Sequence, residues 1–358
     1  MKKKRNLLLP LCISVSILYI ILAARPLATE LQFLPQWTID ASKVTVSKDS
    51  ENLAERYEHA IPFKLGQTLG YFTADGDILS IVSFPYKAAL SSSYYALYGT
   101  NDKKIPFFTP DGKKSGEISA TGFPFFMESK QYLFLPGGSS FAKLDETGKM
   151  QWSYENYAPI TAFSSSEYGC VAGYADGTVI SFADDGKIDQ TFSPGGSEYP
   201  VILGADLSNS GELIACVSGQ NRQRFIVAKK SSNHTAIIHH EYLDTPTTRQ
   251  VLVKFSKDES TVYFGSEDGL GIVDCTTGKS KHLKIGGHIL SICESTESKS
   301  AYILSRNGET CTVHVIEPFA TFAGSFSFKA TSAFIATEHD NLFVGRNNTI
   351  SKMQVTHR

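Results

Sequence analysis

Seven short segments of this chain resemble one another, and this repetition constrains the fold more than any other feature of the sequence. Each segment is an apolar run, then a turn built from Gly, Asn or Asp, then a second apolar run, which is the pattern of a β-hairpin. The segments are residues 96–102, 133–138, 170–177, 215–221, 262–269, 302–308 and 342–348. They recur roughly every 41 residues, a period typical of β-propeller blades. The repeat therefore predicts an all-β ring of four-stranded blades.

A second pattern predicts where the strands lie inside each blade. Turns that end in Asp-Gly or Thr-Gly follow five apolar runs, at residues 72–76, 108–112, 144–148, 182–186 and 273–278. Gly accepts a positive φ and Asp bonds its own backbone, so we expect these turns to join the third strand to the outermost strand. Almost continuously apolar runs suit innermost strands, which are covered on both faces. These runs are residues 160–163, 251–255, 289–293 and 332–336.

The number of blades is predicted as seven or eight. Seven hairpins are clear, and residues 60–84 carry an Asp-Gly turn after a degraded hairpin. About 330 residues beyond the N-terminal segment, divided by the repeat of about 41, slightly favour eight. The sequence ends soon after the last hairpin, so we expect the last blade to lack an outermost strand, which the region around Trp37 can supply. Closing a ring in this way removes exposed sheet edges.

The first 24 residues differ from the rest of the chain. Four basic residues at positions 2–5 precede an uncharged apolar stretch, residues 7–24, whose 18 residues are long enough for a membrane-spanning helix. Because positive charges stay in the cytoplasm, the remainder is expected to be exported. Two alternatives remain open: an uncleaved signal anchor at residues 1–24, which the length favours, and a cleaved signal peptide, which would leave the protein secreted.

The predicted organisation therefore has three parts. Residues 1–24 are the signal anchor or transmembrane segment, residues 25–58 are a linker with the closing strand, and residues 59–358 are the propeller. The formal net charge is −2 and the sequence pI is near 6.5. This balance gives no electrostatic attraction to nucleic acid, so no nucleic-acid partner is expected.

Histidine and cysteine positions do not indicate a metal or disulfide framework. His239 and His240 are adjacent and would point to opposite faces of a strand, so they cannot chelate one ion together. His282 and His288 lack a third ligand nearby. Outside the N-terminal segment the chain has five cysteines, an odd number without a C-x-x-C pair. Each lies in a strand-like run: Cys170, Cys216, Cys275, Cys293 and Cys311. Buried thiols are favoured, with one disulfide between neighbouring strands as the alternative.

The remaining candidates for catalysis are carboxylate pairs. Asp184-Asp185 and Asp258-Glu259 both fall at turns of the repeat, where Asp caps the backbone, so a structural role is favoured over general acid–base catalysis. The chain has neither a Gly-x-Ser-x-Gly nucleophile motif nor a phosphate-binding Gly-x-x-x-x-Gly-Lys-Ser/Thr motif. The sequence thus predicts no catalytic, metal-binding or cofactor-binding residue, and leaves the binding residues unknown.

Two segments carry a family resemblance. Residues 173–187, Gly-Tyr-Ala-Asp-Gly-Thr-Val-Ile-Ser-Phe-Ala-Asp-Asp-Gly-Lys, resemble the repeat of quinoprotein-type (PQQ-like) and WD40-like propellers. Residues 145–152, Asp-Glu-Thr-Gly-Lys-Met-Gln-Trp, match the same consensus, in which a Trp follows the turn. Dehydrogenases of that family carry this Trp in nearly every blade, whereas here it survives once, as Trp152. The chain therefore resembles the quinone-free, BamB-type scaffolds of outer-membrane assembly, which implies protein binding and no cofactor.

The leading hypothesis is a membrane-tethered, extracytoplasmic (periplasmic) propeller that binds protein through its loops or rim. Its single-pass anchor would contact the membrane through residues 7–24. Tyr154, Tyr157 and Tyr199 are the candidate exposed aromatic residues. The alternative is an enzyme or small-ligand receptor that uses the central channel, and it requires polar groups from several blades to converge at one end of the ring.

Overall fold

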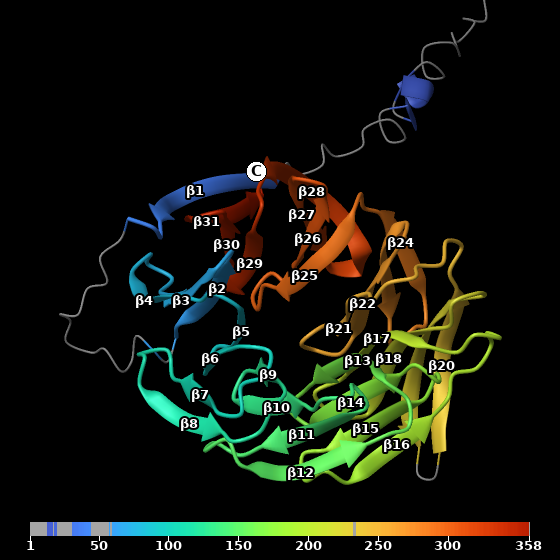
Figure 1. Ribbon diagram of the computed structural model, residues 1–358. Coiled ribbons are helices and arrows are strands. Elements are labelled where there is room, and N and C mark those ends of the chain that lie inside the picture. The colour runs from blue at the N-terminus through green and yellow to red at the C-terminus, as the bar shows by residue number, and fades with distance from the viewer. Residues whose placement is uncertain are drawn as a thin grey trace, which may run out of the picture.

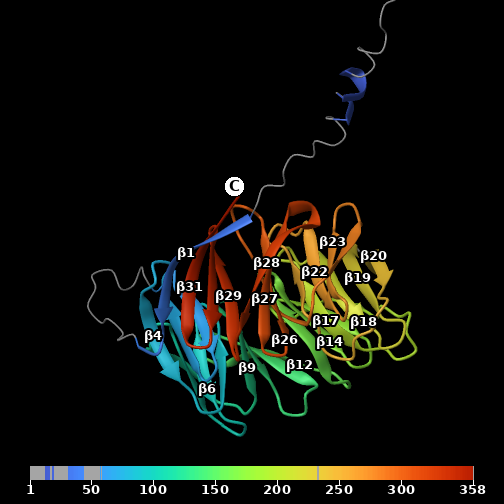
Figure 2. The same ribbon diagram turned by 90° about the horizontal axis from the view of Figure 1, so that it is seen from above.

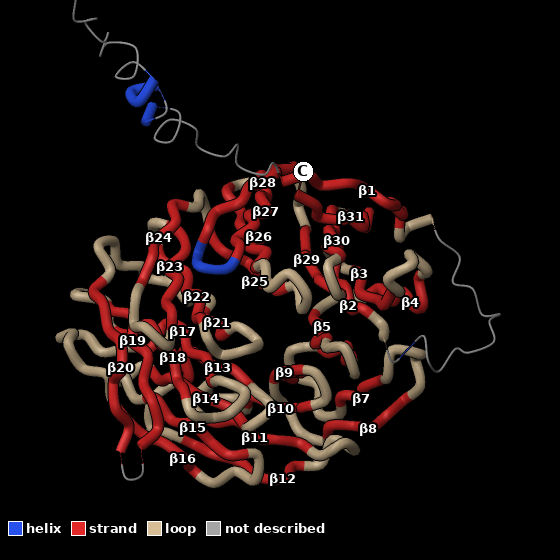
Figure 3. Tube along the Cα trace, turned by 180° about the vertical axis from the view of Figure 1, so that it is seen from behind, coloured by secondary structure: helices blue, strands red, loops and turns tan. Residues whose placement is uncertain are grey.

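The computed structural model describes residues 13–16, 18–19, 31–43, 57, 59–231 and 234–357. Within these residues, strands β1 to β31 form eight sheets arranged as a ring (Figure 1). Figure 3 shows that the described helical residues form only short pieces, in the N-terminal residues, at Tyr57 and in the 3-10 helix η1 (Pro318–Ala320). The eight-bladed, all-β propeller is therefore confirmed, and eight blades are present rather than seven.

The predicted signal anchor falls mostly outside this part of the chain, because residues 1–12, 17 and 20–30 are not described. Among the residues that are described, no helix is both long enough and apolar enough to span a bilayer.

The blades follow one another in chain order, each written here from its innermost strand outward. Blade 1 is β2 (Ile61–Leu65), β3 (Thr68–Phe72) and β4 (Ile78–Ser83), and blade 2 is β5 (Lys87–Leu90), β6 (Tyr95–Tyr98), β7 (Ile105–Phe108) and β8 (Lys114–Ile118). Blade 3 is β9 (Phe123–Met127), β10 (Lys130–Phe134), β11 (Ser140–Leu144) and β12 (Met150–Glu155), and blade 4 is β13 (Ile160–Ser165), β14 (Gly169–Tyr174), β15 (Val179–Ala183) and β16 (Ile188–Phe192).

The second half of the ring has the same arrangement. Blade 5 is β17 (Ile202–Leu207), β18 (Leu213–Ser218), β19 (Arg224–Ser231) and β20 (His234–Tyr242), and blade 6 is β21 (Val253–Phe255), β22 (Thr261–Ser266), β23 (Gly269–Asp274) and β24 (Ser280–Lys284). Blade 7 is β25 (His288–Glu294), β26 (Ala301–Asn307), β27 (Thr310–Glu317) and β28 (Thr321–Lys329), and blade 8 is β29 (Ala333–Glu338), β30 (Asn341–Arg346), β31 (Thr349–His357) and β1 (Leu31–Asp40).

The two predicted turn classes occupy the predicted places. All seven hairpin segments join the second and third strands of a blade, and four of the five Asp-Gly or Thr-Gly turns join a third strand to an outermost strand. The fifth, at residues 72–76, joins β3 to β4, the last two strands of blade 1. One of these turns also shapes an interface between blades. At Gly186, with φ of 85°, a Cβ atom would lie 2.6 Å from the indole of Trp152 in the preceding blade, so only glycine fits this close approach.

The hydrophobic core lies between blades rather than inside any one of them. Middle strands such as β14 and β18 are buried on both faces, whereas outermost strands such as β12 alternate between exposed and half-buried residues. One apolar cluster joins blades 5 and 6, and stacks Phe225 on Phe264 with ring centroids 3.9 Å apart. A blade therefore buries its apolar faces only when both neighbours are present.

Blade 1 departs from the others, since three strands are described for it. The turn at Asp75-Gly76 joins β3 to β4, as such turns elsewhere join the third and outermost strands. By this criterion β2 corresponds to a second strand, yet it lies innermost and contacts β29. Phe63 of β2 stacks on Phe334 of β29 with ring centroids 6.1 Å apart, so β2 itself makes the apolar contact with blade 8.

The ring closes through β1, which is the outermost strand of blade 8. It runs antiparallel to β31 from the Leu31–His357 pair to the Asp40–Thr349 pair, with a bulge between Pro35 and Trp37. The strand expected around Trp37 is thus confirmed. The Trp37 ring packs against Phe343 in its own blade at 5.9 Å and against Phe72 of blade 1 at 6.3 Å between centroids. Its Nε1 donates a hydrogen bond to the carbonyl of Ala74, 3.3 Å away in blade 1.

A buried carboxylate ties three innermost strands together near the middle of the ring. Asp206 of β17 accepts hydrogen bonds from the Ser164 hydroxyl in β13 and from the backbone N–H of Phe255 in β21. Burial raises the pKa of Asp206 to about 6, and this effect exceeds the lowering by the two hydrogen bonds and by Lys254. Asp206 therefore links blades 4, 5 and 6.

We expect Trp37→Ala to destabilise the propeller by about 2–3 kcal/mol, because it leaves a cavity at the seam between blades 8 and 1 and removes one hydrogen bond. The exposed neighbour Gln36 provides the control, since its substitution by Ala should change stability by less than about 0.5 kcal/mol. Guanidinium unfolding of both variants measures the difference. Equal midpoints for Trp37→Ala and wild type would show that the seam does not depend on this side chain.

We expect Asp206→Asn to remove a pH dependence of stability. The native pKa of Asp206, about 6, lies above the ordinary value of 3.8. The protonated carboxyl of Asp206 therefore contributes to the free energy of unfolding in full below pH 4, and this contribution is lost as pH rises through 6. Wild type should therefore lose up to about 3 kcal/mol relative to the variant between pH 4 and pH 7. Denaturant unfolding at several pH values tests this, and a constant difference between the two proteins would contradict it.

Candidate functional site

The turns of the propeller divide between its two faces. The loop face carries the hairpins between second and third strands, together with the connections from each outermost strand to the next innermost strand. Backbone hydrogen bonds join these two kinds of loop, as between Ala175 and Pro159 and between Gly219 and Val201. The opposite face, here called the turn face, carries the remaining turns. The start of β1 and the end of β31 lie together at the turn face (Figure 2).

Exposed aromatic side chains gather on the loop face. Tyr86, Phe123, Tyr157 and Tyr199 expose 74%, 38%, 106% and 61% of their surface, respectively. Each precedes or begins the innermost strand of its blade, and the four blades, 2 to 5, are consecutive in the ring (Figure 1). Exposed tyrosine and phenylalanine supply large contact areas with few rotatable bonds, so they are suited to binding another protein. We call these four residues the aromatic arc.

The sequence had identified only part of this arc. Tyr157 and Tyr199 are exposed as expected, but Tyr154 lies in β12 and packs on Phe182 with ring centroids 4.8 Å apart, which indicates a structural role. Tyr86 and Phe123 were missed. The signal that could have found them is their place in the repeat, since both lie where an outermost strand connects to the next innermost strand.

On this side of the ring, two innermost strands carry lysines beside aromatic rings. The Lys87 ammonium lies 4.5 Å from the centroid of the Phe123 ring, and the Lys64 ammonium lies 5.1 Å from that of Phe84. Burial lowers the pKa of Lys64. In the part of the chain that the structure describes, no group of three His, Cys, Asp or Glu residues is arranged to hold a metal ion.

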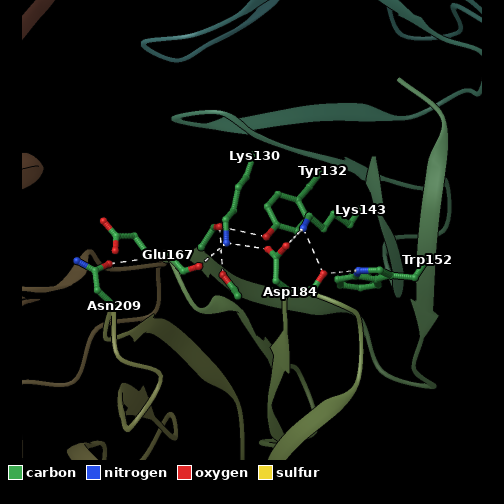
Figure 4. A network of polar contacts seen from close by, with 9 residues as sticks. Lys130, Tyr132, Lys143, Trp152, Glu167, Asp184 and Asn209 are labelled. Atoms are coloured by element: carbon green, nitrogen blue, oxygen red, sulfur yellow. Dashed lines mark hydrogen bonds and ion pairs between the residues drawn. The ribbon is translucent and has the colours of Figure 1, made fainter. Parts of the chain in front are cut away.

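On the turn face, Asp184 forms a polar network between blades 3 and 4 (Figure 4). Lys130 Nζ lies 2.8 Å from Asp184 Oδ1, Lys143 pairs with the same carboxylate, and Trp152 Nε1 donates to the Asp184 carbonyl at 3.1 Å. Burial acts to raise the pKa of Asp184, but the two lysines outweigh it and hold this pKa below its ordinary value. Asp185 instead pairs with Lys187. Asp184 thus bridges two blades, whereas the ion pair of Asp185 stays within its own turn.

The second carboxylate pair also serves turns. Asp258 accepts hydrogen bonds from Ser256 and Ser260, and Glu259 accepts two from Ser210 in the preceding blade. Hydrogen bonds from Ser260 are the largest of the effects that lower the pKa of Asp258. These carboxylates therefore cap loop backbones, as the repeat pattern indicated.

The histidines flagged in the sequence lie apart from one another. The His239 ring lies 3.0 Å from the Gly278 carbonyl, whereas His240 on the opposite strand face is exposed. His282 Nε2 lies 3.3 Å from a Glu241 carboxylate oxygen. His288 lies on the loop face, at the start of β25.

The five cysteines outside the N-terminal segment are free thiols, so the alternative of one disulfide among them is not realised. Three are fully buried, and two are half-buried. Burial raises the pKa of Cys170 and Cys216 to about 12, which suppresses the reactive thiolate.

Comparisons with known proteins agree with this architecture. An uncharacterized protein of Treponema pallidum (strain Nichols) is 29% identical over 365 residues, which cover 99% of this chain and 95% of that protein. Among solved structures, BamB from Moraxella catarrhalis is similar with a TM-score of 0.58 at 12% identity, and the match covers 90% of this chain and all of BamB.

Two yeast propellers are also similar in fold. Sqt1 from Saccharomyces cerevisiae matches with a TM-score of 0.58 at 10% identity, over 80% of this chain and 90% of its own. Hsv2 from Kluyveromyces marxianus matches with a TM-score of 0.53 at 13% identity, over 75% of this chain and 96% of its own. At such identities the likeness concerns the fold alone.

A family model described as "beta-propeller protein" matches residues 1–357. The match extends over nearly the whole sequence, and the eight radial sheets supply the architecture that the description requires. The chain therefore belongs to this beta-propeller protein family.

Proposed function

We propose that this protein is a membrane-tethered, extracytoplasmic propeller that binds a protein partner through its loop face and acts as a scaffold in envelope protein assembly. The observation that carries the proposal is the aromatic arc, four exposed rings on the same face of four consecutive blades. Rigid scaffolds that present variable loops commonly recognise partners in this way. The fold-level similarity to BamB supports the same type of role.

The position of β1 supports a tether that leaves this face accessible. Leu31 begins β1 at the turn face, opposite the aromatic arc. Six residues, 25–30, separate it from the apolar stretch at residues 7–24, and a chain of that length spans at most about 22 Å. An anchor in this stretch would therefore keep the turn face near the bilayer. The loop face would then point away from the membrane, toward a partner in the extracytoplasmic space.

We favour binding over catalysis because the carboxylates and histidines flagged in the sequence serve turns, blade contacts or separate surfaces. The alternative of an enzyme or receptor that uses the channel has its own test. Metal and cofactor analysis of the purified full-length protein should find no stoichiometric ion or quinone, and a bound one would support that alternative.

The aromatic arc can be tested with a double substitution, Tyr157→Ala and Tyr199→Ala. A hot-spot ring contributes about 2 kcal/mol, which is roughly 30-fold in affinity. We therefore expect the partner recovered from detergent-solubilised membranes to bind the double variant roughly 1,000-fold more weakly, and at least roughly 30-fold more weakly if one ring dominates. The control is Ile188→Ala with Phe322→Ala, which removes exposed apolar side chains from outermost strands. A partner that stays bound to the first variant, or is lost equally from both, contradicts a loop-face site.

The tether can be tested by fractionating cells that express the full chain. We expect the protein to stay in the membrane pellet after carbonate extraction and to be degraded by protease added outside the cytoplasmic membrane. Leu18→Arg should increase the extracted fraction, because a charge in the centre of a spanning segment costs about 3 kcal/mol, whereas Ser14→Ala should not. Sequencing of the mature N-terminus distinguishes an anchor from a cleaved signal peptide. If the protein resists the protease added outside the cytoplasmic membrane, it lies in the cytoplasm, and the proposed location is wrong.

A further inference from the structure

A basic pocket opens between blades 6 and 7 on the loop face. Its volume is about 330 Å³. Its walls come from the connection that precedes β21 and from the start of β25. The hairpins that join the second and third strands of blades 6 and 7 complete it. The lining residues that matter for the argument are Thr247, Arg249, Ser266, Glu267, His288 and Arg306.

Arg306 is the unusual member of this pocket. It is the penultimate residue of β26, its side chain is half-buried, and its Nε is inaccessible to solvent without a hydrogen-bond acceptor among the described residues. Buried donors are normally paired, and a buried Nε–H that lacks an acceptor is an exception that calls for one. A planar guanidinium is best satisfied by an oxyanion that receives two parallel hydrogen bonds.

The charges around Arg306 leave an excess of one positive charge. Arg249 Nη2 lies 3.3 Å from Glu267 Oε1, and both side chains are largely exposed, so this ion pair is weak and able to rearrange. Glu267 thus offsets one of the two arginines, and no other carboxylate lines the pocket within the described part of the chain. His288 is the remaining titratable group that faces it. A net charge of about +1 matches a monoanion better than a dianion.

One wall of the pocket is held rigid from beneath. Gln223 is fully buried, accepts a hydrogen bond from the Thr247 N–H and donates one to the Thr247 carbonyl, both at 3.0 Å. Gln223 also donates to the Gly219 carbonyl at 2.8 Å, which fixes the connection before β21 to blade 5. The pocket is therefore preorganised, and an anion that enters it does not have to order the loop.

We propose that this pocket binds a single carboxylate, supplied by the C-terminus or an acidic side chain of the protein partner, with Arg306 as the principal donor and Arg249 as the second. This inference rests on the proposed function for the source of the carboxylate, because the pocket opens on the same face as the aromatic arc. The site itself is defined by the pocket and can be tested without the partner.

The probes are N-acetyl-triglycine with a free carboxylate, the same peptide as its C-terminal amide, and inorganic phosphate. Each is titrated into the purified full-length protein, and binding is measured by calorimetry and by the rise in the thermal unfolding midpoint. We expect the free acid to bind at least tenfold more tightly than the amide and more tightly than phosphate. Equal binding of acid and amide would overturn the carboxylate site, and tighter binding of phosphate would overturn the assignment to a monoanion.

The matched variants are Arg306→Gln and Arg346→Gln. Arg346 is the last residue of β30 and precedes the corresponding hairpin of the next blade, but it does not line the pocket. We expect Arg306→Gln to weaken binding of the free acid at least tenfold and Arg346→Gln to leave it unchanged. Arg306→Lys keeps the charge without the planar donor pair, so it should restore binding only in part. Unchanged binding in Arg306→Gln would overturn the proposal, and if that variant does not fold, unchanged binding in Arg306→Lys and Arg249→Gln would do so.

The outcomes separate this inference from the proposed function. If the free acid binds as expected but the Tyr157 and Tyr199 substitutions leave partner binding intact, the loop-face function fails and the carboxylate site stands. If partner binding depends on those tyrosines but the peptide acid and amide bind alike, the function stands and the carboxylate site fails.

Discussion

The structure depends on one constraint: a blade has no core of its own and buries its apolar faces only against its two neighbours. A chain of such blades stays soluble and stable only if the first and last ones meet. The seam between blades 8 and 1 is therefore the critical contact, and it is made by β2 of blade 1 together with β1, the outermost strand of blade 8. Trp37 on that strand contacts both blades, so the closure of the ring relies on contacts between residues about 300 positions apart in sequence.

The closing strand β1 also distinguishes the two faces of the ring, because it begins at one of them. Because β1 is an outermost strand and pairs Leu31 with His357, the first described strand of the chain begins at the turn face. The turn face is rich in ties between blades, such as the pairing of Asp184 with Lys130 and Lys143. The loop face instead presents exposed rings and a preorganised basic pocket. The groups that we propose to contact a partner therefore lie on the face opposite the Asp184 network.

The role of a carboxylate in this protein depends on which side chains and backbone groups surround it, and a sequence motif does not give that information. Asp184 and Asp258 are charged groups at turns with pKa values held below the ordinary range, as expected of carboxylates that accept hydrogen bonds. Asp206 behaves in the opposite way, because burial between three innermost strands raises its pKa to about 6. No feature of its sequence context, Gly-Ala-Asp-Leu, distinguishes it, since its partners come from two other blades.

The sequence by itself determined the local and periodic features: the hairpins, the Asp-Gly turns, the innermost strands and, through the length of the repeat, a ring of about eight blades. These are encoded locally, because strand and turn preferences act over a few residues. Only the tertiary structure decided that β2 lies innermost in blade 1, that Tyr154 packs inward while Tyr86 and Phe123 are exposed, and that Arg306 and Arg249 line one pocket. These facts depend on how neighbouring blades are placed against each other, which is set by packing between residues far apart in the chain and leaves no periodic signal in the sequence.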